Sequence, residues 1–350
     1  MARVYFLAAG NSARKPAFVF MLVDESMAKP IKPLLLIVTP YLADANNGNW
    51  RTAQRWARLL QTQYRVIVQA NARGAAAGDA ACMIALHARR SHPAIVDWLA
   101  RGPARPLIVA LTGTDLYRDL PEGNADAAAS LELAGALIVL QEDALNHLSA
   151  VHRGKATVVL QSARALTPAR KPDTRLKCAM VGHLRAEKDP LTALRAWRLL
   201  PAAEPIVLRH IGGELDAELG AAARGLMAVE PRYRWLGAVA HGATRQAIKR
   251  AHVLLVPSLM EGGANVVVEA LTSGTAVLGT RMSGNVGMLG ADYPGLFPVG
   301  DSAALAALLL RCRRDPAFLR EITAWCRRRA PLFSPDHERR TLVRVVASLL

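Results

Sequence analysis

The chain has 350 residues, of which 52% are hydrophobic, and a formal net charge of +16. This length favours two domains, because a single hydrophobic core stops growing at about 250–300 residues. The apolar content excludes an intrinsically disordered chain. No apolar run reaches the roughly 18–20 residues that a membrane-spanning helix needs, so we expect no transmembrane segment.

Much of the positive charge lies near the C-terminal end, where arginines recur at helical spacing among few acids. This pattern is typical of a solvated helix face, and no nucleic-acid-binding motif accompanies it. We therefore expect anionic small ligands as partners and no nucleic acid. Peripheral attachment to an anionic membrane through this end stays open as an alternative.

Residues 1–33 precede the first strand pattern, and their short apolar patch is followed by no clear cleavage site. We expect an extension without ordered structure, or a natural start at Met27, in preference to a secretory signal.

The cysteines form no C-x-x-C pair and no zinc or disulfide spacing. We expect the four cysteines to be buried in the core of a cytoplasmic protein. They are Cys82, Cys178, Cys312 and Cys326.

From residue 34 onward, strand-like apolar runs alternate with helix-length segments, which is typical of parallel sheets covered by helices on both faces. The first half predicts strands at 34–38, 66–69, 82–86, 107–111, 136–140 and 157–160, and helices at 49–61, 91–99, 125–133 and 143–151. Residues 163–175 lack periodicity and predict a linker. The second half predicts strands at 177–181, 206–211, 233–236, 253–256, 276–278 and 296–298, and helices at 190–200, 215–229, 244–250, 265–273 and 302–313.

The predicted fold class is therefore α/β, with two doubly wound, Rossmann-like lobes that face a cleft. The N-terminal lobe spans 34–163 and the C-terminal lobe spans 176–330. We expect residues 331–350 to form a helix that crosses back to the N-terminal lobe. Ligands of open parallel sheets bind beyond the carboxyl ends of the strands. The residues that follow each strand are therefore the candidates for a site.

The strongest local signal follows the strand at 253–256, where two glycines lead into an apolar helix. Glycines let the backbone approach a ligand, and the amides of a helix start favour a phosphate. Glu269 lies among valines, alanine and leucine, where a carboxylate is costly without partners, and a ribose diol would supply two donors. The loop itself consists of Glu261, Gly262, Gly263, Ala264 and Asn265.

A second signal follows the strand at 177–181, where His183, Arg185 and Lys188 supply a basic loop. No D-x-D pair or carboxylate cluster is spaced to hold a metal. Lys188 and the amides after Gly263 can instead bind a diphosphate. We expect neither a metal nor another cofactor.

Polar residues also follow three strands of the N-terminal lobe, and their convergence at one sheet edge predicts a pocket opposite the phosphate loop. Several are basic or belong to helix starts, which suits a small, charged acceptor. The predicted acceptor-binding residues are Gly48, Asn49, Arg51, His87, Arg89, Thr112, Gly113 and Thr114, with Arg90 beside them.

Glu261 and Glu269 resemble the E-x7-E motif of the GT4-like family of GT-B glycosyltransferases. The resemblance implies that the C-terminal lobe binds a nucleotide-sugar donor and the N-terminal lobe binds the acceptor. It also implies that Glu261 contacts the donor sugar, that Glu269 binds the ribose, and that Gly237 borders the pocket for the nucleotide base. The family neutralises the diphosphate with a basic residue directly after a glycine and a Lys five positions later. Lys188 matches the second position, but His183 stands where most members have Arg, so either His183 or Arg185 takes the first role.

Six motifs in order resemble a narrower family, the selenosugar synthases of selenoneine biosynthesis. The resemblance covers residues 34–315 and implies transfer of N-acetylglucosamine or glucose from UDP-GlcNAc or UDP-Glc to selenophosphate, with a C–Se bond formed and UDP and phosphate released. It implies catalytic roles for Lys188 and Glu261, and His87 as the residue that orients the acceptor or touches the sugar. The motifs are LHARRS (86–91), LTGTDLYRDL (111–120), GHLRAEKDP (182–190), RYRWLG (232–237), EGGANVVVEAL (261–271) and DYPGLFPVGD (292–301).

Two alternatives stay open. The first is a GT4-like transferase whose acceptor is a carbohydrate, a lipid or another small molecule. The second is a binder of nucleic acid or membrane surfaces that has kept a transferase-like fold. Strongly salt-dependent DNA binding without affinity for a UDP-sugar would favour the second.

Overall fold

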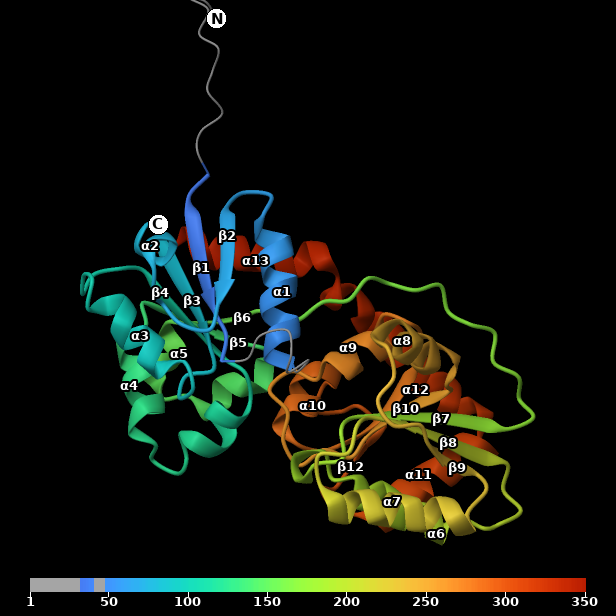
Figure 1. Ribbon diagram of the computed structural model, residues 1–350. Coiled ribbons are helices and arrows are strands. Elements are labelled where there is room, and N and C mark those ends of the chain that lie inside the picture. The colour runs from blue at the N-terminus through green and yellow to red at the C-terminus, as the bar shows by residue number, and fades with distance from the viewer. Residues whose placement is uncertain (1–31, 41–47) are drawn as a thin grey trace, which may run out of the picture. The chain divides into compact units, whose positions relative to one another are not determined.

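Two parallel six-stranded sheets form the framework of residues 33–350 in the computed structural model (Figure 1). The structure describes residues 32–40 and 48–350, so almost all of the predicted extension lies outside the described residues. The first sheet has the order β2-β1-β3-β4-β5-β6 and the second the order β12-β11-β10-β7-β8-β9. The α/β class and the two Rossmann-like lobes are therefore confirmed.

The strands of the first sheet are continuous apolar runs because helices cover both faces of the sheet. Its strands are β1 (Leu34–Val38), β2 (Arg65–Gln69), β3 (Cys82–Leu86), β4 (Leu107–Leu111), β5 (Ala136–Val139) and β6 (Ala156–Val158). Its helices are α1 (Gly48–Leu60), α2 (Ala75–Gly78), α3 (His92–Leu99), the π-helix η2 (Asp115–Asp119), α4 (Ala125–Leu133), the 3-10 helix η3 (Glu142–His147) and α5 (Ala150–Gly154).

The second sheet follows an extended linker and has one continuous core on both of its faces. Its strands are β7 (Leu176–Val181), β8 (Ile206–Ile211), β9 (Tyr233–Trp235), β10 (Val253–Val256), β11 (Ala276–Thr280) and β12 (Leu296–Phe297). The helices are η4 (Ala186–Lys188), α6 (Pro190–Leu199), α7 (Ala217–Val229), α8 (His241–Arg250), α9 (Asn265–Leu271), α10 (Ser283–Leu289), α11 (Ser302–Arg314), α12 (Pro316–Arg329), η5 (Ala330–Phe333) and α13 (Pro335–Ala347).

The C-terminal helix α13 packs on the lobe that contains the first sheet, beside α1 (Figure 1). Leu342, Val345 and Val346 are buried in the same core as Trp56 and Leu60 of α1. The chain thus leaves the second lobe at its end and completes the hydrophobic core of the first. This contact brings residues near the end of the chain to the junction of the lobes.

One of the predicted helices needs correction, and the prediction omitted helix α10. The segment predicted as one helix at 143–151 is divided into η3 and α5, because Leu148 and Ser149 are extended and the Ser149 side chain accepts from the amide of His152 to begin α5. Helix α10 was not predicted, since Gly284 and Gly287 weaken its helical pattern. In the part of the chain that the structure covers, no helix is both long and apolar enough to cross a membrane.

Candidate active site

A cleft of about 340 Å³ lies where the carboxyl ends of the two sheets meet. Sixteen of the eighteen predicted site residues line it. From the first lobe these are Gly48, Asn49, Arg51, His87, Thr112, Gly113 and Thr114; from the second they are His183, Arg185, Lys188, Glu261, Gly262, Gly263, Ala264, Asn265 and Glu269. The two clusters that sequence reasoning assigned to separate lobes therefore share one cavity.

The loop between β10 and α9 lies against the first lobe. Backbone atoms approach so closely here that a Cβ on Gly262 would lie 2.1 Å from the carbonyl oxygen of Thr112 and 2.7 Å from the amide nitrogen of Gly113. A Cβ on Gly263 would lie 2.8 Å from Cβ of Leu140. Both glycines are thus required by the close contact between the lobes, and at neither is a left-handed backbone the reason.

Glu261 is held at the rim of this loop by two donors. Lys188 Nζ donates to Glu261 Oε1, and Ser258 Oγ donates to the same oxygen over 2.8 Å. The predicted cation and the predicted sugar-binding carboxylate therefore form an ion pair.

Glu269 is 8% exposed and its carboxylate lies in the cleft. His241, the first residue of α8, lies 2.6 Å from Glu269 Oε1 through its Nε2. This partner was missed by sequence reasoning, because nothing in the sequence around His241 marks it as part of a site. The contact satisfies one carboxylate oxygen of a side chain that the sequence predicted to need donors.

The basic loop after β7 has one neutral and two cationic side chains. His183 Nδ1 accepts a hydrogen bond from the amide of Gly213 at 2.9 Å. Burial, together with Arg185 and Lys188, lowers the pKa of His183, so its ring is neutral at pH 7. Of the two residues that the sequence left open for the first basic position, Arg185 is therefore the one that carries a charge.

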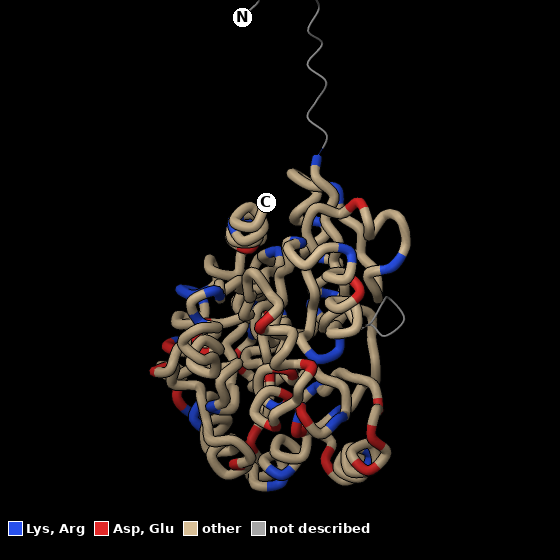
Figure 2. Tube along the Cα trace, turned by 90° about the vertical axis from the view of Figure 1, so that its left-hand side faces the viewer, with Lys and Arg blue, Asp and Glu red and all other residues tan. Residues whose placement is uncertain are grey.

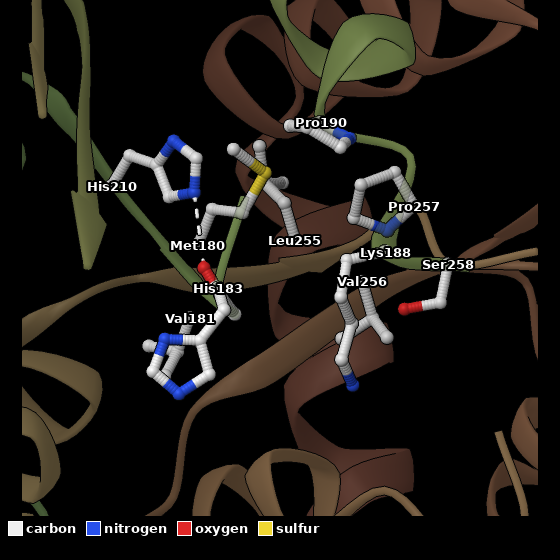
Figure 3. A pocket seen from close by; sticks show the side chains of 11 residues that line it. Met180, Val181, His183, Lys188, Pro190, His210, Leu255, Val256, Pro257 and Ser258 are labelled. Carbon is white, nitrogen blue, oxygen red and sulfur yellow. Dashed lines mark hydrogen bonds between the residues drawn. The ribbon is translucent and has the colours of Figure 1, made fainter. Parts of the chain in front are cut away.

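A small cavity of about 10 Å³ lies behind this loop, with room for about one water molecule (Figure 3). His210 of β8 faces it and contacts the hydroxyl of Tyr233 through Nδ1 (2.9 Å) and the carbonyl of Gly182 through Nε2 (3.3 Å). Burial lowers the pKa of His210 to about 4. A neutral histidine thus supports the backbone from which His183 and Lys188 project.

On the opposite side of the cleft, His87 has a left-handed backbone with φ of 75°. This conformation is uncommon for residues other than glycine and is concentrated at functional sites. Nδ1 accepts from the amide of Arg90 (3.3 Å), so Nε2 carries the proton and donates to Thr114 Oγ1 (2.8 Å). Burial lowers the pKa of His87, although the nearby Asp115 opposes the shift.

Asp115 fixes this side of the cleft from beneath, and its side chain is fully buried. Its carboxylate accepts hydrogen bonds from the backbone amides of Ala88, Thr112, Gly113 and Leu116, at 2.8–3.1 Å. One carboxylate therefore ties the loop after β3 to the loop after β4. This arrangement explains how His87 and Thr114 come to face one another.

Two predicted site residues, Arg89 and Gly237, lie outside the cleft lining. Arg89 donates from Nε to Asp119 at 2.7 Å, and its neighbour Arg90 lines the cleft. Gly237 makes a turn with φ of +65° and its carbonyl accepts from the amide of Gly212 at 2.9 Å. Ala238 and Val239 line the cleft in its place.

The structure adds lining residues that the sequence did not identify, and they come from both lobes: Thr52, Leu140, Gln161, Val181, Glu187, Ile211, Thr244, Met260 and Val266. Within residues 32–40 and 48–350, no group of three His, Cys, Asp or Glu side chains could hold a metal ion. Acidic and basic positions are interspersed along the trace in the view of Figure 2.

Comparison with known proteins places the chain in a family. The family model described as Glycosyl transferases group 1 matches residues 130–325. The structure is similar to Anabaena Alr3699/HepE in complex with UDP and glucose, with 16% identity, a TM-score of 0.70, and coverage of 91% of this chain and 100% of that chain. No curated protein matches the sequence.

Two further solved structures are similar over the same share of the chain. Sucrose-phosphate synthase (tll1590) from Thermosynechococcus elongatus has 16% identity and a TM-score of 0.71, with 91% of this chain and 99% of that chain covered. A glycosyltransferase from Rickettsia africae ESF-5 has 13% identity and a TM-score of 0.68, with 91% and 98% covered. Because the family model spans more than half of the sequence and both lobes have the GT-B arrangement, the chain belongs to the group 1 glycosyl transferases.

Proposed function

We propose that this glycosyltransferase moves a hexose, N-acetylglucosamine or glucose, from a UDP-sugar to selenophosphate. The observation that carries the proposal is the shared cleft, which brings a carboxylate pair and basic side chains of one lobe opposite basic and polar side chains of the other. The solved relative Alr3699/HepE has structures in complex with UDP, with UDP and glucose, and with UDP-glucose. These complexes support a uridine diphosphate donor here.

The donor would lie along the second lobe. Glu269 would exchange its contact with His241 for the two hydroxyls of the ribose. Lys188 and Arg185 would face the diphosphate, and Glu261, released from Lys188, would contact the sugar. A fixed cation of this kind stabilises the charge that develops on the leaving group, so the proposal needs no metal.

The acceptor would enter from the first lobe, where Arg51, Arg90 and His87 line the cleft. Cationic side chains of this kind suit a small, multiply charged anion. The selenium atom would attack the anomeric carbon as the bond to UDP breaks, and water would then cleave the Se–P bond to release phosphate. The resemblance of six motifs to those of selenosugar synthases is what favours selenophosphate over other anions in this proposal.

The donor assignment is tested by replacing Glu269 with Gln, and Glu218→Gln on the exposed start of α7 is the matched control. Each charged hydrogen bond lost costs about 1.5–3 kcal/mol, so E269Q should weaken UDP-sugar binding by at least tenfold. E218Q should bind as the wild type does. Calorimetric titration that found equal affinity in E269Q and wild type would contradict the assignment.

The acceptor assignment is tested with a panel of acceptors. Wild-type protein is incubated with UDP-GlcNAc or UDP-Glc and either selenophosphate, simple carbohydrates or lipid acceptors, and the products are identified by mass. The proposal expects a selenosugar with selenophosphate alone. Transfer to a carbohydrate or lipid in place of selenophosphate would favour the broader alternative, to which the similarity with sucrose-phosphate synthase also points.

A further inference from the structure

A buried carboxylate lies outside the cleft and has no role in the proposed chemistry. Glu338 of α13 is fully buried and accepts hydrogen bonds from Arg55 Nε (3.0 and 3.1 Å), Trp56 Nε1 (2.7 Å), and the amide and hydroxyl of Ser162 (2.9 and 2.5 Å). A buried charge is tolerated when it is paired and fully hydrogen-bonded, as this one is. The donors come from α1 and from the segment that leaves the first sheet.

Arg55 extends from this carboxylate into the second lobe. Its Nη1 donates to Asn265 Oδ1 at 3.1 Å, at the first residue of α9. The side-chain amide of Gln161 has partners for both its nitrogen and its oxygen in one orientation. In that orientation the nitrogen donates to Asn265 Oδ1 (3.1 Å) and to the carbonyl of Gly263 (2.9 Å), and the oxygen accepts from Arg55 Nη2 (3.2 Å). Arg55 is thus joined to the loop 261–265 by a direct and an indirect route.

We propose that Arg55 is a positioning residue for glycosyl transfer. Held by Glu338, it fixes the loop 261–265 through Asn265 and Gln161 and so sets the orientation of the donor. The inference rests on the proposed function, since that function assigns the donor to this loop. Arg55 itself does not line the cleft, and it acts through residues that do.

The side chains in this network favour a role in positioning the loop 261–265 over a role that only attaches helix α13 to the first lobe. Helix α13 is already anchored by Leu342, Val345 and Val346, and a buried ion pair seldom adds stability beyond what apolar side chains would give. A guanidinium has donors on Nε and both Nη atoms in a rigid fork, so one side chain can contact Glu338, Asn265 and Gln161 together. The ammonium of a lysine cannot reproduce this geometry.

The test is a double variant, Arg55→Gln with Glu338→Gln, which removes both charges at once. A glutamine at position 55 ends near the place of the arginine Nε, so it can reach residue 338 but not Asn265. Ser162→Ala is the matched control, because it removes a hydrogen bond to Glu338 without touching the loop. Donor Kd, KM, kcat and melting temperature are measured for wild type and both variants.

We expect the double variant to raise donor Kd and KM about tenfold while it remains folded, and S162A to keep both within twofold of wild type. Unchanged donor affinity in the folded double variant would overturn the role of Arg55, as would an equal loss in S162A. If the double variant does not fold, Arg55→Lys replaces it, because this variant keeps a cation beside Glu338. We again expect donor Kd and KM to rise about tenfold, and unchanged donor affinity would again overturn the role of Arg55. Failure of wild-type protein to bind any UDP-sugar would refute the proposed function and not this role alone.

Discussion

Substitution of Gly262 by alanine tests whether close contact between the lobes sets the rate of transfer. The added Cβ would lie 2.1 Å from the carbonyl oxygen of Thr112, whereas ordinary van der Waals contact begins at 3.4 Å. Both neighbours are backbone atoms, which cannot rotate away as a side chain could. The lobes must therefore move apart at this point by roughly 1 Å.

A displacement of this size is expected to reduce kcat by about 100-fold, since a misplacement of about 1 Å can cost that much in a positioned reaction. Gly262 lies in the loop between β10 and α9, outside both sheets, so we expect the melting temperature to change less than the rate. Gly225→Ala in α7 is the control, because its Cβ would meet nothing within 4 Å. It should keep full activity and gain about 0.5–1 kcal/mol of stability.

Steady-state kinetics with UDP-sugar and acceptor, together with thermal unfolding, measure both effects. A G262A protein that keeps kcat within threefold of wild type would refute the reasoning. So would a loss of activity that G225A shares. If G262A also lowers the melting temperature strongly, the loss of kcat reflects damage to the fold and not a change in the contact between the lobes.

Three further outcomes follow from buried polar and apolar groups. Asp115→Asn turns an amide NH₂ toward backbone N–H donors and should lower the free energy of unfolding by about 3 kcal/mol. Urea denaturation measures this loss, and an unchanged midpoint would contradict it. His210 has a pKa of about 4 when folded against about 6.5 when unfolded, so the unfolded chain binds more protons between these values. Stability should therefore fall by up to about 3 kcal/mol as pH drops from 6.5 to 4, and His210→Gln, measured over the same range, should flatten that slope if the histidine is its source. Leu342→Ala should lose about 3 kcal/mol and Leu350→Ala, whose side chain is exposed, almost nothing; equal unfolding midpoints would argue against packing of α13 on the first lobe.

Local sequence patterns were sufficient to predict the strands and the face of the molecule that carries the site. Parallel strands covered on both faces are continuous apolar runs, and β3 and β4 are fully buried along their lengths. Their carboxyl ends share one edge of the sheet, so residues distant in sequence, such as His87 and Thr114, could be placed together in advance. The spacing of Glu261 and Glu269 around a glycine pair marked, in the same way, a loop that lines the cleft.

Pairings between distant segments were decided only by the tertiary structure. His241 lies 28 positions before Glu269, and Arg55 lies 283 positions before Glu338, so neither pair leaves a periodic or local signature. Likewise, Arg90 lines the cleft whereas Arg89 pairs with Asp119, and no local pattern in the sequence distinguishes these neighbouring arginines. Sequence thus determined which chemistry the strand ends offer, whereas the packing of the lobes and of α13 determined which side chains meet, because long-range contacts are fixed by the shape of the whole core.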